Sequence, residues 1–256
     1  MIQDTTFAYS ELTRVLPWSF RALGYKFGTA DRAAHLVATA AAMNPALLDE
    51  MVHVRMRPAG SPTLTRAPGF LTMDAHGISL LELGPVAVDY LAAHVDDAEL
   101  NTCIITAVTE VSLIPAVLIA AGTYDMRCVA LVTGRGKPTW HYVGHDGGST
   151  VLVSGTSLES LDALMPDQYN IRSKLPPLDD PAGTVVLIAG DAVPLITPPA
   201  EAIRPAELIS LAHRRGIPVS QATLDALYGL EMLTWAPTSE RSRAQAGFTA
   251  PSVSAQ

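Results

Sequence analysis

The spacing of hydrophobic and polar residues predicts that the chain opens with two helices. Apolar residues recur at helical intervals over residues 9–23, and Gly24 follows as a stop signal. A second helical run covers residues 30–43, with Thr29 in front of it and Asn44-Pro45 behind it. The pattern therefore predicts an N-terminal helical pair.

The pattern then changes to the alternation that is typical of strands. Residues 51–57 alternate apolar and polar, and residues 69–83 contain two strand-like runs around the sequence Asp74-Ala-His-Gly77. We expect a strand and then a hairpin, separated by a loop at 58–68, which is rich in Pro, Gly, Ser and Thr. A helix is predicted from Pro85 onward, because proline is well tolerated at the first helical position.

Strands and helices alternate through the rest of the chain. Strands are predicted at 102–108, 126–132, 151–153 and 184–189, and helices at 113–121, 158–164, 204–215 and 220–233. The proline-containing segment 166–181 is either a lid or a surface connection. The order predicts an α/β fold, with a mixed sheet, flanking helices and further helices at the C-terminus. We expect one domain over residues 1–247 and a frayed tail over 248–256.

Composition and charge narrow the class of protein. Of 256 residues, 48% are hydrophobic and 16% are charged, which favours one substantial core. The net charge of -8 argues against a nucleic-acid binder, which needs basic residues to displace counterions. The longest apolar run, 111–121, is too short to span a bilayer. Cys103 and Cys128 lack metal or disulfide spacing, and no secretory signal is visible, so we expect a cytoplasmic protein.

The segment 140–149 is the densest group of reactive side chains. His141 and His145 are candidate acids or bases, with Asp146 as an orienting carboxylate. Gly147 and Gly148 would let backbone amides approach an anion. The alternative interpretation is a hairpin with His-Asp-Gly-Gly at its tip.

Two further segments are candidates for chemistry. His76, in Asp74-Ala-His-Gly-Ile-Ser79, is a possible acid or base, although the same residues also suit a tight turn. Arg241, Ser242 and Arg243 suit a carboxylate or phosphate, although a helix-capping turn also explains these residues. The histidines lack metal-ligand spacing, so we predict no metal site.

Two resemblances accompany these motifs. Residues 7–42 resemble the N-terminal helical pair of the malate/L-lactate dehydrogenase family that is unrelated to the classical Rossmann dehydrogenases, and Asp74-Ala-His-Gly-Ile-Ser79 resembles its Asp-Ser-His-Gly motif. This resemblance implies active-site roles for His76 and His141, and NAD(P)-linked interconversion of 2-oxo and 2-hydroxy or imino acids. The overall order, with Leu-Gly-Pro-Val-Ala-Val-Asp89, is also similar to a conserved bacterial family of unknown function, which implies no reaction.

Three hypotheses follow from the sequence. The first is an oxidoreductase that uses His76 or His141 as proton donor and Arg241 or Arg243 as a clamp for the substrate carboxylate, with NAD(P) as its candidate cofactor. The second is a cofactor-free hydrolase or lyase that uses the pair His145-Asp146. The third is a non-catalytic partner subunit in a homo- or hetero-oligomer.

Overall fold

The computed structural model describes residues 4–51, 56–94, 101–134, 138–157, 159–161, 183–191, 193–199 and 201–235. Within these residues, a mixed sheet of seven strands has the order β2-β3-β4-β8-β5-β6-β7. The strands are β2 (Thr63–Ala67), β3 (Phe70–Asp74), β4 (Asn101–Thr106), β5 (Cys128–Thr133), β6 (Thr139–Asp146), β7 (Ser149–Gly155) and β8 (Thr184–Ala189).

The direction of the strands explains the mixed character of the sheet. β3 and β4 are parallel, whereas β8 runs antiparallel to both β4 and β5 and lies between them. The predicted strand–helix–strand unit over 102–132 is therefore present, but its two strands are separated by a strand from much later in the chain. A separate two-stranded ribbon joins β1 (Asp4–Phe7) to β9 (Ile217–Ser220).

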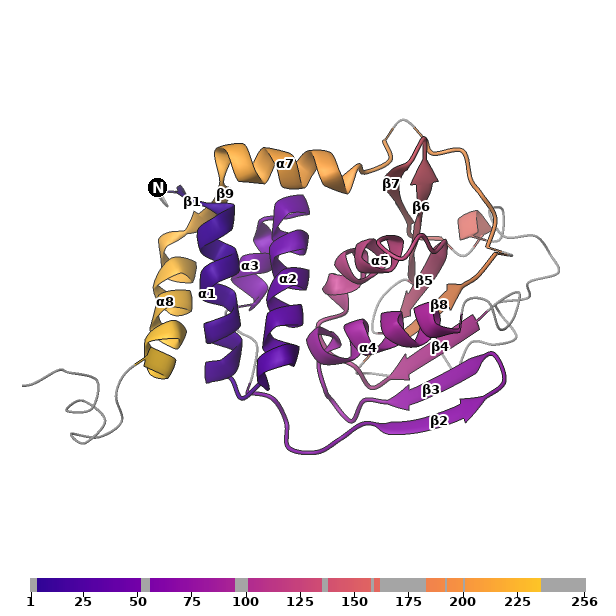
Figure 1. Cartoon of the computed structure of the whole chain (residues 1–256), viewed down its shortest axis with the longest axis horizontal. Coiled ribbons are helices and arrows are strands. Elements are labelled where there is room, and N and C mark those ends of the chain that lie inside the picture. Colours follow the sequence, from indigo (N-terminus) through magenta and orange to yellow (C-terminus); the bar gives the residue numbers. More distant parts are fainter. Residues whose placement is uncertain are drawn as a thin grey trace, which may run out of the picture.

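Helices cover the sheet and form a bundle beside it (Figure 1). α4 and α5 lie over one face of the sheet, α1, α2, α3 and α8 stand together at its side, and α7 crosses above them (Figure 1). Their bounds are α1 (Tyr9–Ala22), α2 (Phe27–Met43), α3 (Ala46–Met51), α4 (Leu80–Ala93), α5 (Ile114–Gly122), α7 (Pro205–Arg215) and α8 (Gln221–Trp235), with a 3-10 turn η1 (Val111–Leu113) before α5. The predicted fold class is confirmed.

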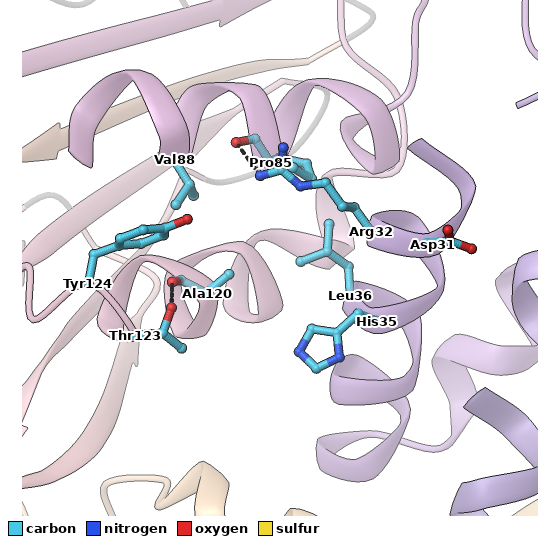
Figure 2. Close-up of a pocket in the computed structure, with 9 residues that line it drawn as sticks. All are labelled: Asp31, Arg32, His35, Leu36, Pro85, Val88, Ala120, Thr123 and Tyr124. Atoms are coloured by element: carbon cyan, nitrogen blue, oxygen red, sulfur yellow. Dashed lines mark hydrogen bonds between the residues drawn. The ribbon is translucent and has the colours of Figure 1, made fainter. Parts of the chain in front are cut away.

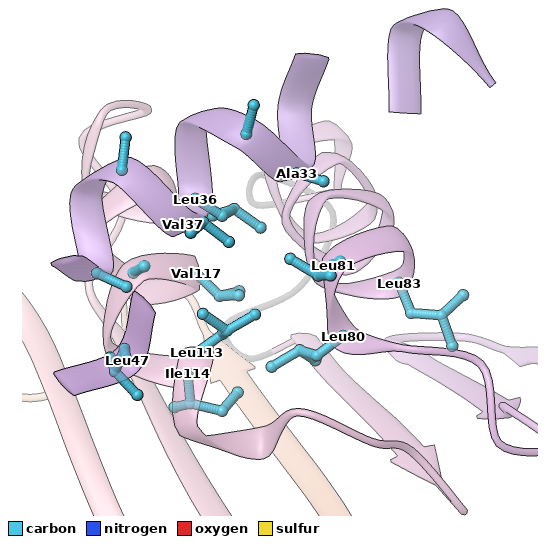
Figure 3. Close-up of a cluster of buried hydrophobic side chains, with 14 of the residues drawn as sticks. Ala33, Leu36, Val37, Leu47, Leu80, Leu81, Leu83, Leu113, Ile114 and Val117 are labelled. Atoms are coloured by element: carbon cyan, nitrogen blue, oxygen red, sulfur yellow. The ribbon is translucent and has the colours of Figure 1, made fainter. Parts of the chain in front are cut away.

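The main core joins the helical bundle to the covered face of the sheet. Leu36 and Val37 of α2 meet Leu80 and Leu81 of α4 and Val117 of α5 in one cluster of buried side chains (Figure 3). A second cluster, which includes Trp140 and Tyr142, covers the opposite face of the sheet. Because both faces of the central strands are buried, these strands are apolar throughout, as the sequence showed. The prediction of one domain over 1–247 stays a prediction, since residues 236–256 lie outside the described part.

Several predicted boundaries are wrong. The second helix begins at Phe27, three residues before the expected start. Met51 ends helix α3, although a strand was expected from that residue, and residues 52–55 lie outside the described part. The predicted loop 58–68 contains strand β2, which pairs with β3, so the hairpin lies one strand earlier than expected. Every residue of β2 is exposed, and the strand therefore carries no hydrophobic alternation that could reveal it.

The helix predicted to begin at Pro85 begins at Leu80 instead. Ser79 caps it, because its side-chain oxygen accepts a hydrogen bond from the backbone N–H of Leu81 at 3.0 Å. The leucines in the first turn of α4 are buried in the core. In the sequence they form a short apolar run, which is also typical of a strand. Of the helix predicted at 158–164, only residues 159–161 are described and they are helical. The loop 166–181 and the tail lie outside the described part.

Candidate active site

The loops that follow β3 and β4 run side by side at one edge of the sheet. The backbone N–H of Ala75 donates to the carbonyl of Thr106 at 2.9 Å, and that of Gly77 donates to the carbonyl of Ala107 at 2.8 Å. Because β3 and β4 are parallel, both loops emerge at the carboxyl ends of their strands. In α/β folds, ligands gather at such edges.

Three residues of these loops have left-handed backbone conformations. The φ angles are 49° at His76, 52° at Ala107 and 54° at Glu110. In the described residues, Asp125 is the only other residue besides glycine with a positive φ. Each such conformation costs about 1–2 kcal/mol in a residue that carries a Cβ, and strain of this kind clusters at functional sites. His76 and Gly77 form a tight turn, which the hydrogen bond from the backbone N–H of Ile78 to the carbonyl of Ala75 closes at 2.9 Å, so the tight-turn interpretation is confirmed. The left-handed residues that gather in these two joined loops make this edge the candidate for an active site.

The side chain of His76 is oriented by neighbours on both ring nitrogens. Its Nδ1 lies 3.3 Å from Oδ1 of Asp74, which also accepts the backbone N–H of His76 at 3.1 Å. Its Nε2 lies 3.0 Å from the hydroxyl oxygen of Thr63 on β2. The imidazole is 55% exposed and so is accessible to a substrate. A histidine that is oriented by a carboxylate and open to solvent suits general acid–base catalysis.

A buried tyrosine supports the loop from behind. Tyr25 is 4% exposed and hydrogen-bonds to Ser79, the residue that caps α4. Burial raises the pKa of Tyr25 to about 12, and the nearby carboxylates of Glu110 and Glu82 raise it further. The phenol therefore stays protonated at neutral pH, and its hydrogen bond with Ser79 holds it against the loop.

The edge is acidic, which limits what it can bind. Asp74, Glu82 and Glu110 contribute carboxylates, and Arg57 is held by Glu82 through contacts of 2.6 and 2.8 Å. This pairing raises the pKa of Arg57. The described residues at this edge therefore do not fit the pyrophosphate of a nicotinamide dinucleotide, which requires uncommitted cations or a cradle of backbone amides.

His141 does not join His76 in one site. It lies within β6, and not in a loop after β5 as the sequence suggested. Four strand spacings of about 4.8 Å separate β3 from β6, so the strands that carry the two histidines are about 19 Å apart across the sheet. Burial lowers the pKa of His141 to about 4, and its Nδ1 contacts the hydroxyl of Ser154 at 2.7 Å. His141 is therefore neutral at physiological pH and has a structural partner.

The pair His145-Asp146 is not formed. Consecutive side chains of a strand point to opposite faces, so these two residues of β6 face apart. His145 Nε2 lies 3.3 Å from Oδ1 of Asp125, and Asp146 accepts a hydrogen bond from Arg204 at 2.8 Å. The carboxylate beside His145 is therefore that of Asp125 and not that of Asp146, and a role for His145 as a base stays a prediction.

Gly147 and Gly148 form the turn between β6 and β7. Their φ angles are 56° and 81°, and the flanking residues Asp146 and Ser149 pair in register. Two positive φ angles in a two-residue loop are the geometry of a type I′ hairpin turn. The alternative interpretation, a hairpin with His-Asp-Gly-Gly at its tip, is confirmed. The approach of an anion to the amides of the two glycines stays a prediction.

The remaining candidates and the metal prediction concern other parts of the chain. Arg241, Ser242 and Arg243 lie outside the described residues, so their proposed carboxylate site stays a prediction. Within the described residues, no group of three or more His, Cys, Asp or Glu side chains could hold a metal ion. No described helix has the length and apolar character needed to cross a membrane.

Sequence reasoning missed three residues at the edge. Thr63 was placed in a loop, and Tyr25 gave no signal because it lies between two helices. Glu110 follows a predicted strand at 102–108, and its position offered a clue, since polar residues after a strand often face a ligand. Its neighbour Thr109 donates a short hydrogen bond to the Glu110 carboxylate.

Comparison with known proteins supports the fold. Malate dehydrogenase from Entamoeba histolytica matches with a TM-score of 0.66 at 7% identity, covering 92% of this chain and 99% of that chain. Malate dehydrogenase from Pyrococcus horikoshii OT3 matches with a TM-score of 0.66 at 10% identity, covering 93% and 98%. Delta1-piperideine-2-carboxylate reductase from Pseudomonas syringae matches with a TM-score of 0.61 at 13% identity, covering 88% and 99%.

These structures share their fold with this chain. No protein-family model matches the sequence, and no curated protein matches it either. The resemblance of the sequence to malate/L-lactate dehydrogenases thus has a counterpart in the fold, whereas the resemblance to a bacterial family of unknown function stays a prediction. At such low identities the likeness shows the fold alone.

Proposed function

We propose that the chain is a small-molecule enzyme of the oxidoreductase class that acts on 2-oxo, 2-hydroxy or imino acids. The observation that carries this proposal is the His76–Asp74 pair on the joined loops at the carboxyl edge of β3 and β4. The known dehydrogenases and the reductase that share the fold support the reaction class.

In this proposal His76 transfers the proton. Asp74 holds Nδ1, so Nε2 faces the hydroxyl of Thr63 and can exchange a proton with an oxygen or nitrogen atom of a substrate that displaces this contact. Tyr25 and Ser79 keep the loop fixed, which reduces the reorganisation needed when substrate binds.

A nicotinamide nucleotide is the first electron donor to test, because the proteins with a similar fold include dehydrogenases. The acidic edge does not fit the pyrophosphate of such a nucleotide. The only role proposed for this edge is therefore proton transfer by His76. Arg241, Ser242 and Arg243 remain the proposed anchor for a substrate carboxylate.

The first experiment is thermal unfolding of the protein with and without NADH and NADPH. A ligand at a hundred times its dissociation constant adds about 2.7 kcal/mol of stability. For a domain of this size, 1 kcal/mol raises the melting temperature by about 2–4 °C, so a bound nucleotide should raise it by roughly 5–10 °C. The absence of any shift with either nucleotide would reject the nicotinamide-dependent reaction.

The second experiment tests His76 directly. His76→Asn should lower turnover of 2-oxo acids at least about 100-fold, since a positioned acid or base contributes roughly 10²–10⁴-fold. The control is His213→Asn, which changes an exposed histidine on α7. Equal turnover in both variants would remove His76 from the mechanism, and a folded protein without turnover on any such acid would favour a partner-subunit role.

A further inference from the structure

A pocket of about 330 Å³ opens between α2, α4 and α5. Leu36 of α2, Pro85 and Val88 of α4, and Ala120 of α5 give it apolar walls, and Tyr124 closes one side (Figure 2). All of its lining residues belong to the described part of the chain. The pocket lies in the helical layer and uses none of the residues proposed for proton transfer.

The packing of α4 against α5 explains why the pocket exists. At Gly84 the two helices approach so closely that a Cβ atom would lie 2.7 Å from Cγ2 of Val117. One turn farther along each helix, Val88 and Ala120 line open space instead. The pocket therefore lies one helical turn beyond the close contact at Gly84.

The charges around the pocket are already paired. Arg32 holds Asp89 through contacts of 2.7 and 2.8 Å and also donates to the carbonyl of Pro85 at 3.0 Å. Asp31 is paired with Arg21 at 2.7 Å. An anionic ligand would have to displace one of these carboxylates from its arginine. The pocket consequently favours a neutral ligand.

Two polar groups remain available to a ligand. Figure 2 shows the His35 imidazole projecting from α2 into the space and the Tyr124 hydroxyl directed toward its interior. Neither group makes a hydrogen bond or ion pair with another described residue, and the tyrosine is 54% exposed. They offer a donor and an acceptor at the rim of an apolar slot, beside an aromatic ring on which a flat ligand can stack.

We propose that this pocket binds a neutral bicyclic heteroaromatic ring of the size of a purine. The apolar walls and the Tyr124 ring suit a flat ring system, and His35 with the Tyr124 hydroxyl suits the polar edge of a heterocycle. The volume lies at the lower end of the range for small-molecule pockets, about 300–1,000 Å³, which suits one such ring system. The proposal stands independently of the reaction proposed for His76.

The test is the binding of adenine to the protein at neutral pH. Isothermal titration calorimetry and NMR chemical-shift changes of the protein measure this binding. Ala120→Leu fills the pocket and should weaken binding more than about 10-fold. The matched control is Ala222→Leu, at an exposed position of α8, which should bind adenine as the unaltered chain does. Tyr124→Phe and His35→Ala each remove one polar group and should weaken binding about 3- to 10-fold.

Each outcome decides the proposal. Binding that Ala120→Leu abolishes and Ala222→Leu preserves supports it. No binding of adenine at millimolar concentration overturns it, and so does binding that Ala120→Leu leaves unchanged. Benzoate, a flat anion, provides the remaining comparison: if it binds more tightly than adenine, the pocket is not one for neutral ligands.

Discussion

Acidification should destabilise this protein through His141. This half-buried imidazole on β6 contacts the Ser154 hydroxyl, and burial lowers its pKa from the usual 6.5 to about 4. Between those two values the unfolded chain binds a proton that the folded chain does not. Stability supplied by the neutral imidazole is therefore present at neutral pH and is lost as the pH falls through this window.

The size of the effect follows from the two pKa values. Between pH 7 and pH 5, the difference in proton binding lowers the free energy of unfolding by about 2 kcal/mol if the imidazole is fully shielded from solvent. Partial contact with solvent reduces this loss to about 1–2 kcal/mol. His141→Gln does not titrate and keeps an amide that can hydrogen-bond to Ser154. The variant should therefore lose about 1–2 kcal/mol less stability than the unaltered chain over this interval.

Urea unfolding at pH 7, 6 and 5, followed by tryptophan fluorescence, measures this difference. His213→Gln serves as the control, because it replaces an exposed histidine on α7. We expect the control to lose stability in parallel with the unaltered chain. If His141→Gln also did so, the imidazole would not be held neutral by burial, and the reasoning would be refuted.

Three further predictions concern packing and backbone, each measured by denaturant unfolding. Gly84→Val should cost about 1–3 kcal/mol, because its Cβ would meet Val117, and an unchanged midpoint would contradict the close approach of α4 and α5. Gly148→Ala should cost about 1–2 kcal/mol because the turn needs a φ of 81°, and a neutral result would mean that the turn is not type I′. Arg57→Met leaves the half-buried carboxylate of Glu82 without its partner and should lower the free energy of unfolding by about 1–3 kcal/mol at pH 7. Adding Glu82→Gln to this variant should recover part of the lost stability, because it removes the unpaired charge.

Local patterns in the sequence determined many elements of the fold. The periodic apolar residues predicted the helical pair, and the apolar run at 184–189 predicted β8 with its observed bounds. The adjacent glycines at 147 and 148 allowed a hairpin, because only glycine adopts left-handed conformations at low cost. These features depend on residues that are close in sequence, so the sequence alone could reveal them.

Only the tertiary structure decided how these elements meet. β8 pairs with β4 through contacts such as Ile104 with Val186, and this insertion of a late strand separates His76 from His141. The exposed strand β2 forms because β3 offers it hydrogen bonds, and not because of its own hydrophobic pattern. Backbone hydrogen bonds likewise join the loop of His76 to the loop that follows β4, for example between Gly77 and Ala107. Hydrogen bonds between distant backbone segments depend on the arrangement of the whole chain, which no local pattern encodes.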